Sequence, residues 1–161
     1  MASHLPPLPY PSKLPERIEF NESSGPLWRI EFLGGRGIPS GSPRPSYRFD
    51  SPTRAYEVLY ASDDYYAPYA EVFGDLRLVT RNQLSRRRLV EMAPRRPLRL
   101  VSLDDAQTQK VLGIDARICT DGRYQLTQAW SQAIHDAYEA ADGIRYISRS
   151  EERRVGKECR L

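Results

Sequence analysis

The sequence is poor in the residues that build metal sites and disulfides, with two cysteines and two histidines in 161 residues. His4 lies in a proline-rich start and His135 stands alone on an expected helix, so no zinc-site spacing is present and we expect no metal. Cys159 lies in a tail of doubtful origin, so a disulfide is not expected in a chain that we take to be cytoplasmic. No apolar run approaches the length of a membrane span, and the start has no apolar signal-peptide core.

Several other signals are also missing. The net charge of +3 is small and does not favour direct nucleic-acid binding. There is no G-x-S-x-G nucleophile elbow, and Gly34–Gly37 lacks both the GxxxxGK and the GxGxxG phosphate patterns. The length and an ordinary hydrophobic fraction of 40% fit one modest domain.

Prolines concentrate at the start, and residues 1–22 are predicted to form an extended lead. A flexible or surface-hugging lead is the simpler interpretation, and binding to a groove on a partner is the alternative. Gly34 to Pro45 is rich in Gly, Pro and Ser and is predicted to be a loop. The arginine run Arg86–Arg88 suits a solvated face better than a phosphate site.

The order of strand-like and helix-like segments predicts an α+β fold, a compact single domain with a curved, mostly antiparallel sheet and flanking helices. The clearest helix, Gln128 to Ala141, has apolar residues at helical spacing, and Gly143 suits a left-handed cap after it. A second helix begins near Pro68 and carries Glu71. The segments that read as strands are Leu27–Phe32, Ala55–Tyr60, Leu76–Thr80, Leu98–Leu103 and Ile144–Ile147.

Arg48, Tyr60 and Glu71 supply an arginine, an aromatic ring and a carboxylate near one strand-to-helix corner. These types suit an anionic, aromatic ligand such as a nucleotide. A guanidinium binds a diphosphate, a ring stacks on a base, and a carboxylate stabilises a positively charged sugar transition state. Simpler interpretations stay open: Glu71 as a surface carboxylate, Arg48 as a partner of Asp50, and Tyr60 as a core residue.

The same residues lie in segments that resemble the RES domain family, named for arginine, glutamate and serine. The front half carries RFDSP, VLYASDD and AEVF. The back half carries LRLVSLDD, LGIDARICTDGRYQLTQAWSQAIHDA and ADGIRYISR in the family's order. The resemblance runs from Leu27 to Arg149 and rests on the ordered set, because each piece alone is unspecific.

RES proteins are NAD-consuming toxins, usually paired with an Xre-type helix-turn-helix antitoxin, and their fold is similar to that of ADP-ribosyltransferase toxins. The resemblance therefore implies that NAD is the substrate and that phosphorolysis or hydrolysis cleaves its nicotinamide–ribose bond, with inorganic phosphate as a possible second reactant. It implies catalytic roles for Glu71, Arg48 and Tyr60. It implies NAD-binding roles for Arg29, Arg48, Tyr60 and Ser148. An ADP-ribosyltransferase acting on a protein, or a non-catalytic interaction protein, is the alternative.

The last residues, 150–161, resemble the conceptual translation of a sequencing-library adapter and do not continue the family pattern. A charged, solvated tail is the plainer alternative. We therefore expect a RES-like domain over residues 23–149 that lacks its own final strand, with the residues from Ser150 onward disordered or loosely packed.

We expect the genomic codons after Arg149 to differ from those for Glu151–Arg160, because an adapter translation has no counterpart in the gene. Resequencing the locus measures this directly. Codons for Glu151–Arg160 in genomic DNA would contradict the adapter interpretation.

Overall fold

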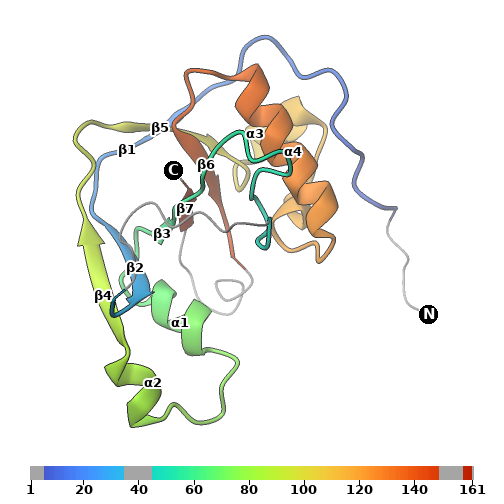
Figure 1. The fold of residues 1–161 in the computed structure, drawn as a ribbon. Coiled ribbons are helices and arrows are strands. Elements are labelled where there is room, and N and C mark those ends of the chain that lie inside the picture. The colour runs from blue at the N-terminus through green and yellow to red at the C-terminus, as the bar shows by residue number, and fades with distance from the viewer. Residues whose placement is uncertain (1–5, 35–44, 149–157, 161) are drawn as a thin grey trace.

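The computed structural model describes residues 6–34, 45–148 and 158–160, the last three by their backbone. Figure 1 shows a mixed arrangement, with α4 beside β6 on one side and β2, β4, α1 and α2 on the other. The elements are β1 Asn21–Ser23, β2 Leu27–Phe32, β3 Tyr60–Ser62, α1 Ala67–Phe73, α2 Arg81–Ser85, β4 Arg87–Met92, β5 Leu98–Ser102, α3 Ala106–Leu112, the 3-10 helix η1 Ala116–Cys119, α4 Tyr124–Ala137, β6 Gly143–Tyr146 and β7 Glu158–Arg160.

The strands form one sheet in the order β1-β5-β6-β7-β3-β2-β4. β5 and β6 run parallel, and the other described neighbours run antiparallel. The predicted α+β fold with a mostly antiparallel sheet is therefore confirmed. The further likeness to ADP-ribosyltransferases stays a prediction.

The two faces of the sheet carry separate apolar clusters. Val101 and Ile144 pack with Trp130 and other side chains of α4, and this is the larger cluster. Leu27 and Leu100 belong to the smaller cluster. Because successive side chains of a strand point to opposite faces, Leu100 and Val101 fix which face is which. We call these the α4 face and the reverse face.

Helix α4 keeps the predicted apolar stripe but not the predicted bounds. Trp130 and Ile134 are buried, and Tyr138, just after the helix, is 5% exposed. The helix runs four residues further toward the N-terminus than predicted and ends at Ala137, well before Gly143. Gly143 instead begins β6, so the predicted glycine cap is wrong. The left-handed glycine cap belongs to Gly113, after α3, at a φ of 69°.

Two predicted strands are also wrong, and local hydrogen bonds explain both. Before β3, the Ser51 hydroxyl accepts a hydrogen bond from the Ala55 amide at 2.9 Å, which folds that segment into a turn. In the segment Leu76–Thr80, Leu78 is 77% exposed and Thr80 forms a capping box with Gln83 at the start of α2. Alternating apolar residues form a strand only where a neighbouring strand pairs with them.

The proline-rich lead packs against the domain over its described part, residues 6–20, where it forms neither helix nor strand. Leu8 is 3% exposed and belongs to the cluster of the α4 face. The Trp130 indole donates to the carbonyl of Pro9 at 2.7 Å. The lead is therefore surface-hugging, as its simpler interpretation held, and Figure 1 shows it passing along α4.

The end of the chain supplies a strand to the sheet. β7 lies between β3 and β6, with Tyr60 opposite Arg160 and Arg145 opposite Cys159. The expectation of loose packing is wrong for these three residues, because backbone pairing does not require an alternating side-chain pattern. Residues 149–157 and 161 lie outside the described residues, and the adapter origin of the tail stays a prediction. Among the described residues, no helix has the length and apolarity needed to cross a membrane.

We expect Leu126→Ala to lower the free energy of unfolding by about 2–5 kcal/mol, because it opens a cavity at a fully packed site. The matched control is Leu78→Ala, which we expect to stay within about 0.5 kcal/mol of the parent. Leu126 is 1% exposed and Leu78 is 77% exposed. Urea unfolding of the three proteins measures both values. Equal losses of unfolding free energy in Leu126→Ala and Leu78→Ala would contradict the placement of α4 over the sheet.

Candidate functional site

The Arg48 turn, residues 46–51, is held by the carboxylate of Asp50. Its Oδ2 accepts the backbone N–H groups of Ser46 and Tyr47, each at 2.9 Å. Its Oδ1 accepts the Tyr60 hydroxyl at 3.1 Å, and that hydroxyl accepts the Phe49 N–H at 3.0 Å. The structure therefore joins Tyr60 to the Arg48 turn and gives Asp50 partners other than the guanidinium of Arg48.

Polar side chains of α4 form hydrogen bonds with the carbonyl groups of the same turn. The Thr127 hydroxyl donates to the Arg48 carbonyl at 2.6 Å, and the Ser131 hydroxyl donates to the Phe49 carbonyl at 2.8 Å. The Gln128 amide donates to the Tyr47 carbonyl at 2.9 Å. Sequence reasoning missed this contact, although polar residues at i, i+1 and i+4 beside an apolar stripe are a usable signal.

The side chain of Arg48 points to the start of α4. It is half-buried, its Nη1 donates to the Asp121 carbonyl, and its guanidinium carbon lies 5.5 Å from the Tyr124 ring centroid. Its Nε and Nη2 have no hydrogen-bond partner within the part of the chain that the structure describes. These donors are therefore available to a ligand.

The charges around Arg48 favour an anion. The carboxylate of Asp121 pairs with Arg123 at 2.5 Å, and this hydrogen bond is the main reason why the pKa of Asp121 falls to about 2. Arg48 lowers that pKa further. Two guanidinium groups thus lie near one carboxylate, which also accepts the Arg123 N–H at 2.8 Å, and the Arg123 side chain does not cap the start of α4, where helix N–H groups carry partial positive charge.

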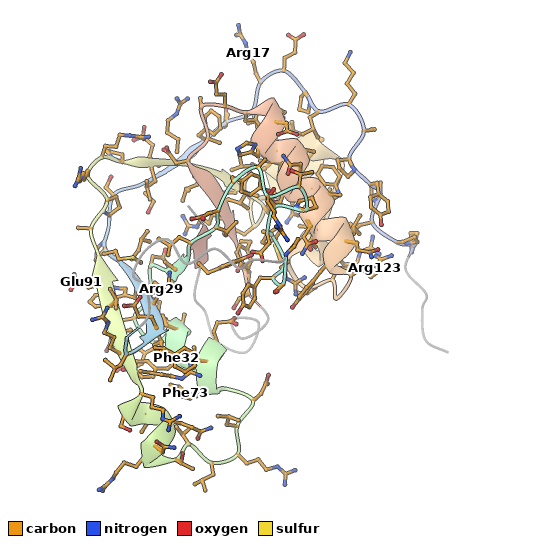
Figure 2. All side chains as sticks on the ribbon, in the orientation of Figure 1. Arg17, Arg29, Phe32, Phe73, Glu91 and Arg123 are labelled. Atoms are coloured by element: carbon orange, nitrogen blue, oxygen red, sulfur yellow. The ribbon has the colours of Figure 1, made fainter. Side chains whose placement is uncertain are left out.

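Glu71 lies in α1, which begins at Ala67 with Pro68 in its first turn, as predicted. The side chain of Glu71 is exposed. The segment at the start of α1 packs against β2, since the rings of Tyr65 and Trp28 are 6.2 Å apart. At the C-terminal end of α1, the Arg87 guanidinium lies over the rings of Phe32 and Phe73, which Figure 2 labels on β2 and α1.

Arg29 does not share a sheet face with Tyr60. Trp28 is paired with Ser62, so Tyr60 lies on the same face as Trp28, and Arg29 lies on the reverse face with Leu27. The Nε atom of Arg29 lies 4.0 Å from Oε2 of Glu31, and the Arg29 side chain is 16% exposed. The structure thus places α1, Tyr60 and the Arg48 turn on the α4 face and separates Arg29 from them.

Ser148 follows β6 by two residues and is 4% exposed. Tyr146, the last residue of β6, packs on Phe49 of the Arg48 turn with ring centroids 4.7 Å apart. Ser148 therefore lies close in sequence to a strand end that contacts the turn.

Other chemistries gain no support from the described residues. Within them, no group of three or more His, Cys, Asp or Glu could hold a metal ion. The ring of His135 stacks on Tyr56 at 4.3 Å and its Nδ1 faces Asp136, without a serine in the arrangement of a triad. In the arginine run, Arg87 covers Phe32 and Arg88 pairs with Glu31 at 2.7 Å. Gly35–Gly37 and His4 lie outside the described residues.

The fold of this chain has a solved counterpart. It is similar to a chain in the crystal structure of the M. tuberculosis MbcT-MbcA toxin-antitoxin complex, with a TM-score of 0.65 and 17% sequence identity. The similarity covers 88% of this chain and 75% of that chain. At this identity, the likeness establishes the fold alone. A comparison with curated proteins finds no match.

The family follows from the sequence match. Residues 26–159 match the family model of the RES domain, so the chain belongs to the RES domain family. The matched range covers Arg29, Arg48, Tyr60, Glu71 and Ser148 and runs past Arg149 into the tail. The resemblance seen in the sequence is therefore confirmed, while the roles of those residues remain proposals.

We expect Tyr60→Phe to lower the free energy of unfolding by about 1–3 kcal/mol, because the Phe49 N–H and the Asp50 carboxylate each lose a partner in a half-buried turn. Tyr47→Phe is the matched control. Tyr47 is 59% exposed, its ring contacts Tyr60, and its hydroxyl has no hydrogen bond among the described residues. Urea unfolding compares the two variants. Equal stability of both would contradict the hydrogen-bonded role of the Tyr60 hydroxyl.

Proposed function

We propose that this protein cleaves the nicotinamide–ribose bond of NAD, with inorganic phosphate or water as the acceptor. The observation that carries the proposal concerns Arg48. Hydrogen bonds to the turn and to α4 hold its backbone, while its guanidinium keeps N–H groups available. Arg123 and the start of α4, at Tyr124, lie beside it. A diphosphate fits this arrangement of positive charge.

Glu71 is the residue to which we assign the chemical step. In that step the bond from ribose C1 to nicotinamide breaks, and its electron pair leaves with the nicotinamide nitrogen. The acceptor oxygen then bonds to C1, and a water acceptor also releases a proton. The transition state carries positive charge on the ribose, and a carboxylate beside it stabilises that charge.

The remaining residues receive supporting roles in the proposal. Tyr60 holds the Arg48 turn through its hydroxyl, and its ring is proposed to stack on the nicotinamide or lie near it. Ser148 is proposed to bind ribose or phosphate, because it follows the strand end that packs on the turn. Arg29 lies on the reverse face, so its proposed contact with NAD rests on the resemblance to the family and not on proximity to the Arg48 turn.

The biological role that we propose is that of a cytoplasmic toxin neutralised by a protein antitoxin, with an Xre-type antitoxin as the specific expectation. Membership of the RES domain family supports the toxin role. The similar chain occurs in a complex of a toxin with its antitoxin, which supports a protein partner. Nicotinamide release measured with and without inorganic phosphate distinguishes phosphorolysis from hydrolysis.

We expect the folded protein to release nicotinamide from NAD, because the chain belongs to the RES family and Arg48 keeps guanidinium N–H groups available to the NAD diphosphate. Nicotinamide is measured by chromatography, with and without inorganic phosphate. A strict phosphate requirement selects phosphorolysis, and release in its absence selects hydrolysis. No release under either condition, from protein shown to be folded by circular dichroism, would overturn the enzyme assignment.

We expect Glu71→Gln to keep most NAD affinity and lose most turnover, because the charge acts mainly in the transition state. Glu57→Gln is the matched control, since Glu57 is also exposed and lies outside the proposed site. NAD affinity by calorimetry and nicotinamide release are measured for both. A Glu71→Gln turnover within about twofold of the parent, roughly 0.4 kcal/mol, would remove Glu71 from the mechanism.

A further inference from the structure

The described lead is recognised through its backbone as well as through its side chains. The Trp130 indole donates to the Pro9 carbonyl at 2.7 Å, and the Tyr138 hydroxyl donates to the Pro15 carbonyl at 2.9 Å. Next to the first of these contacts, Leu8 is buried at 3% exposure in the cluster of the α4 face. Trp130 in α4 and Tyr138 just after it thus offer two directed donors to one extended segment, and we use the word groove for the surface that these donors and the buried contacts of Leu8 form.

A third donor extends this groove beyond α4. The Arg117 guanidinium donates to the Pro6 carbonyl, and the carboxylate of Asp115 holds Arg117 through hydrogen bonds of 2.9 and 2.6 Å. The carboxylate orients the donor, much as a supporting residue orients a ligand-binding group. The carbonyl groups of Pro6, Pro9 and Pro15 bind Arg117, Trp130 and Tyr138 in that order. The lead therefore runs parallel to the segment from η1 through α4.

The chemistry of the groove matches the chemistry of proline. A proline residue has no backbone N–H, so a proline-rich segment cannot pair with a strand and offers its carbonyl groups instead. Aromatic side chains with an N–H or O–H at the tip are the groups that recognise such segments, because they combine flat apolar contact with a donor. Burial raises the pKa of Tyr138, which keeps the donated proton in place.

We propose that the groove formed by Arg117, Trp130 and Tyr138 is a binding site for an extended proline-rich segment, and that the lead is a separable ligand that occupies it. The occupant is the lead of this chain, residues 6–20. It joins the domain through the three-residue strand β1 and an exposed turn at Ser24–Gly25. Beyond this short connection, the lead is held by the three donor contacts, by the buried Leu8, and by Leu14, Ile18 and Phe20, which pack against the cluster of the α4 face.

The experiment uses the full chain with a specific protease site inserted at Gly25, where a side chain would meet nothing within 4 Å. After cleavage, an excess of a fluorescent peptide of residues 1–24 is added and its binding is followed by anisotropy. We expect the peptide to replace the cut lead while circular dichroism of the remainder stays unchanged. Exchange of this kind shows that the groove binds the segment without a covalent link.

Two conservative variants test two of the three named donors, Trp130 and Tyr138. Trp130→Phe and Tyr138→Phe keep aromatic rings but remove the indole N–H and the hydroxyl. We expect each to weaken peptide binding about fivefold, the factor that corresponds to ~1 kcal/mol for one hydrogen bond. Trp28→Phe, on β2 beside Tyr65, is the control and should leave affinity unchanged.

Three results would overturn the proposal. The first is a cut lead that never exchanges below the unfolding transition, because the lead is then an integral part of the core. The second is a cut lead that dissociates at once and no measurable binding of the peptide to a folded remainder. The third is affinity that is the same in Trp130→Phe, Tyr138→Phe and the parent.

Discussion

Helix α4 is the constraint on which the rest of the molecule depends, because its sides make three different kinds of contact. Its apolar stripe, with Trp130 and Ile134, packs on the sheet. Its polar side, with Thr127 and Ser131, holds the carbonyl groups of the Arg48 turn. The indole of Trp130 also binds the lead. A displacement of α4 therefore moves the core, the Arg48 turn and the lead together.

This arrangement explains how a segment without helix or strand is held in one position. The Arg48 turn has no regular secondary structure, so its position comes from side chains that bind its backbone. Asp50 binds two of its N–H groups, and α4 binds its carbonyl groups. With the backbone fixed on both sides, the Arg48 turn is preorganised for the anion binding that we propose, because less conformational freedom remains to be lost on binding.

Much of the fold and part of the site could be predicted from the sequence. The strand Leu27–Phe32, the stripe of α4 and the helix carrying Glu71 follow from periodicity and from one proline, which are local signals. The segment before β3 could not be predicted, because the Ser51 side chain rather than strand pairing decides its shape. The opposite placement of Arg29 and Tyr60 depends on strand register, which only the assembled sheet fixes.

The central claim is that NAD binds on the α4 face, between the Arg48 turn and α1. The most direct measurement is a crystal structure of Glu71→Gln soaked with NAD, in which slow turnover preserves the substrate. We expect the diphosphate within hydrogen-bond distance of the Arg48 guanidinium, with the nicotinamide ribose beside residue 71. NAD bound instead on the reverse face, against Arg29 and away from Arg48, would contradict the account.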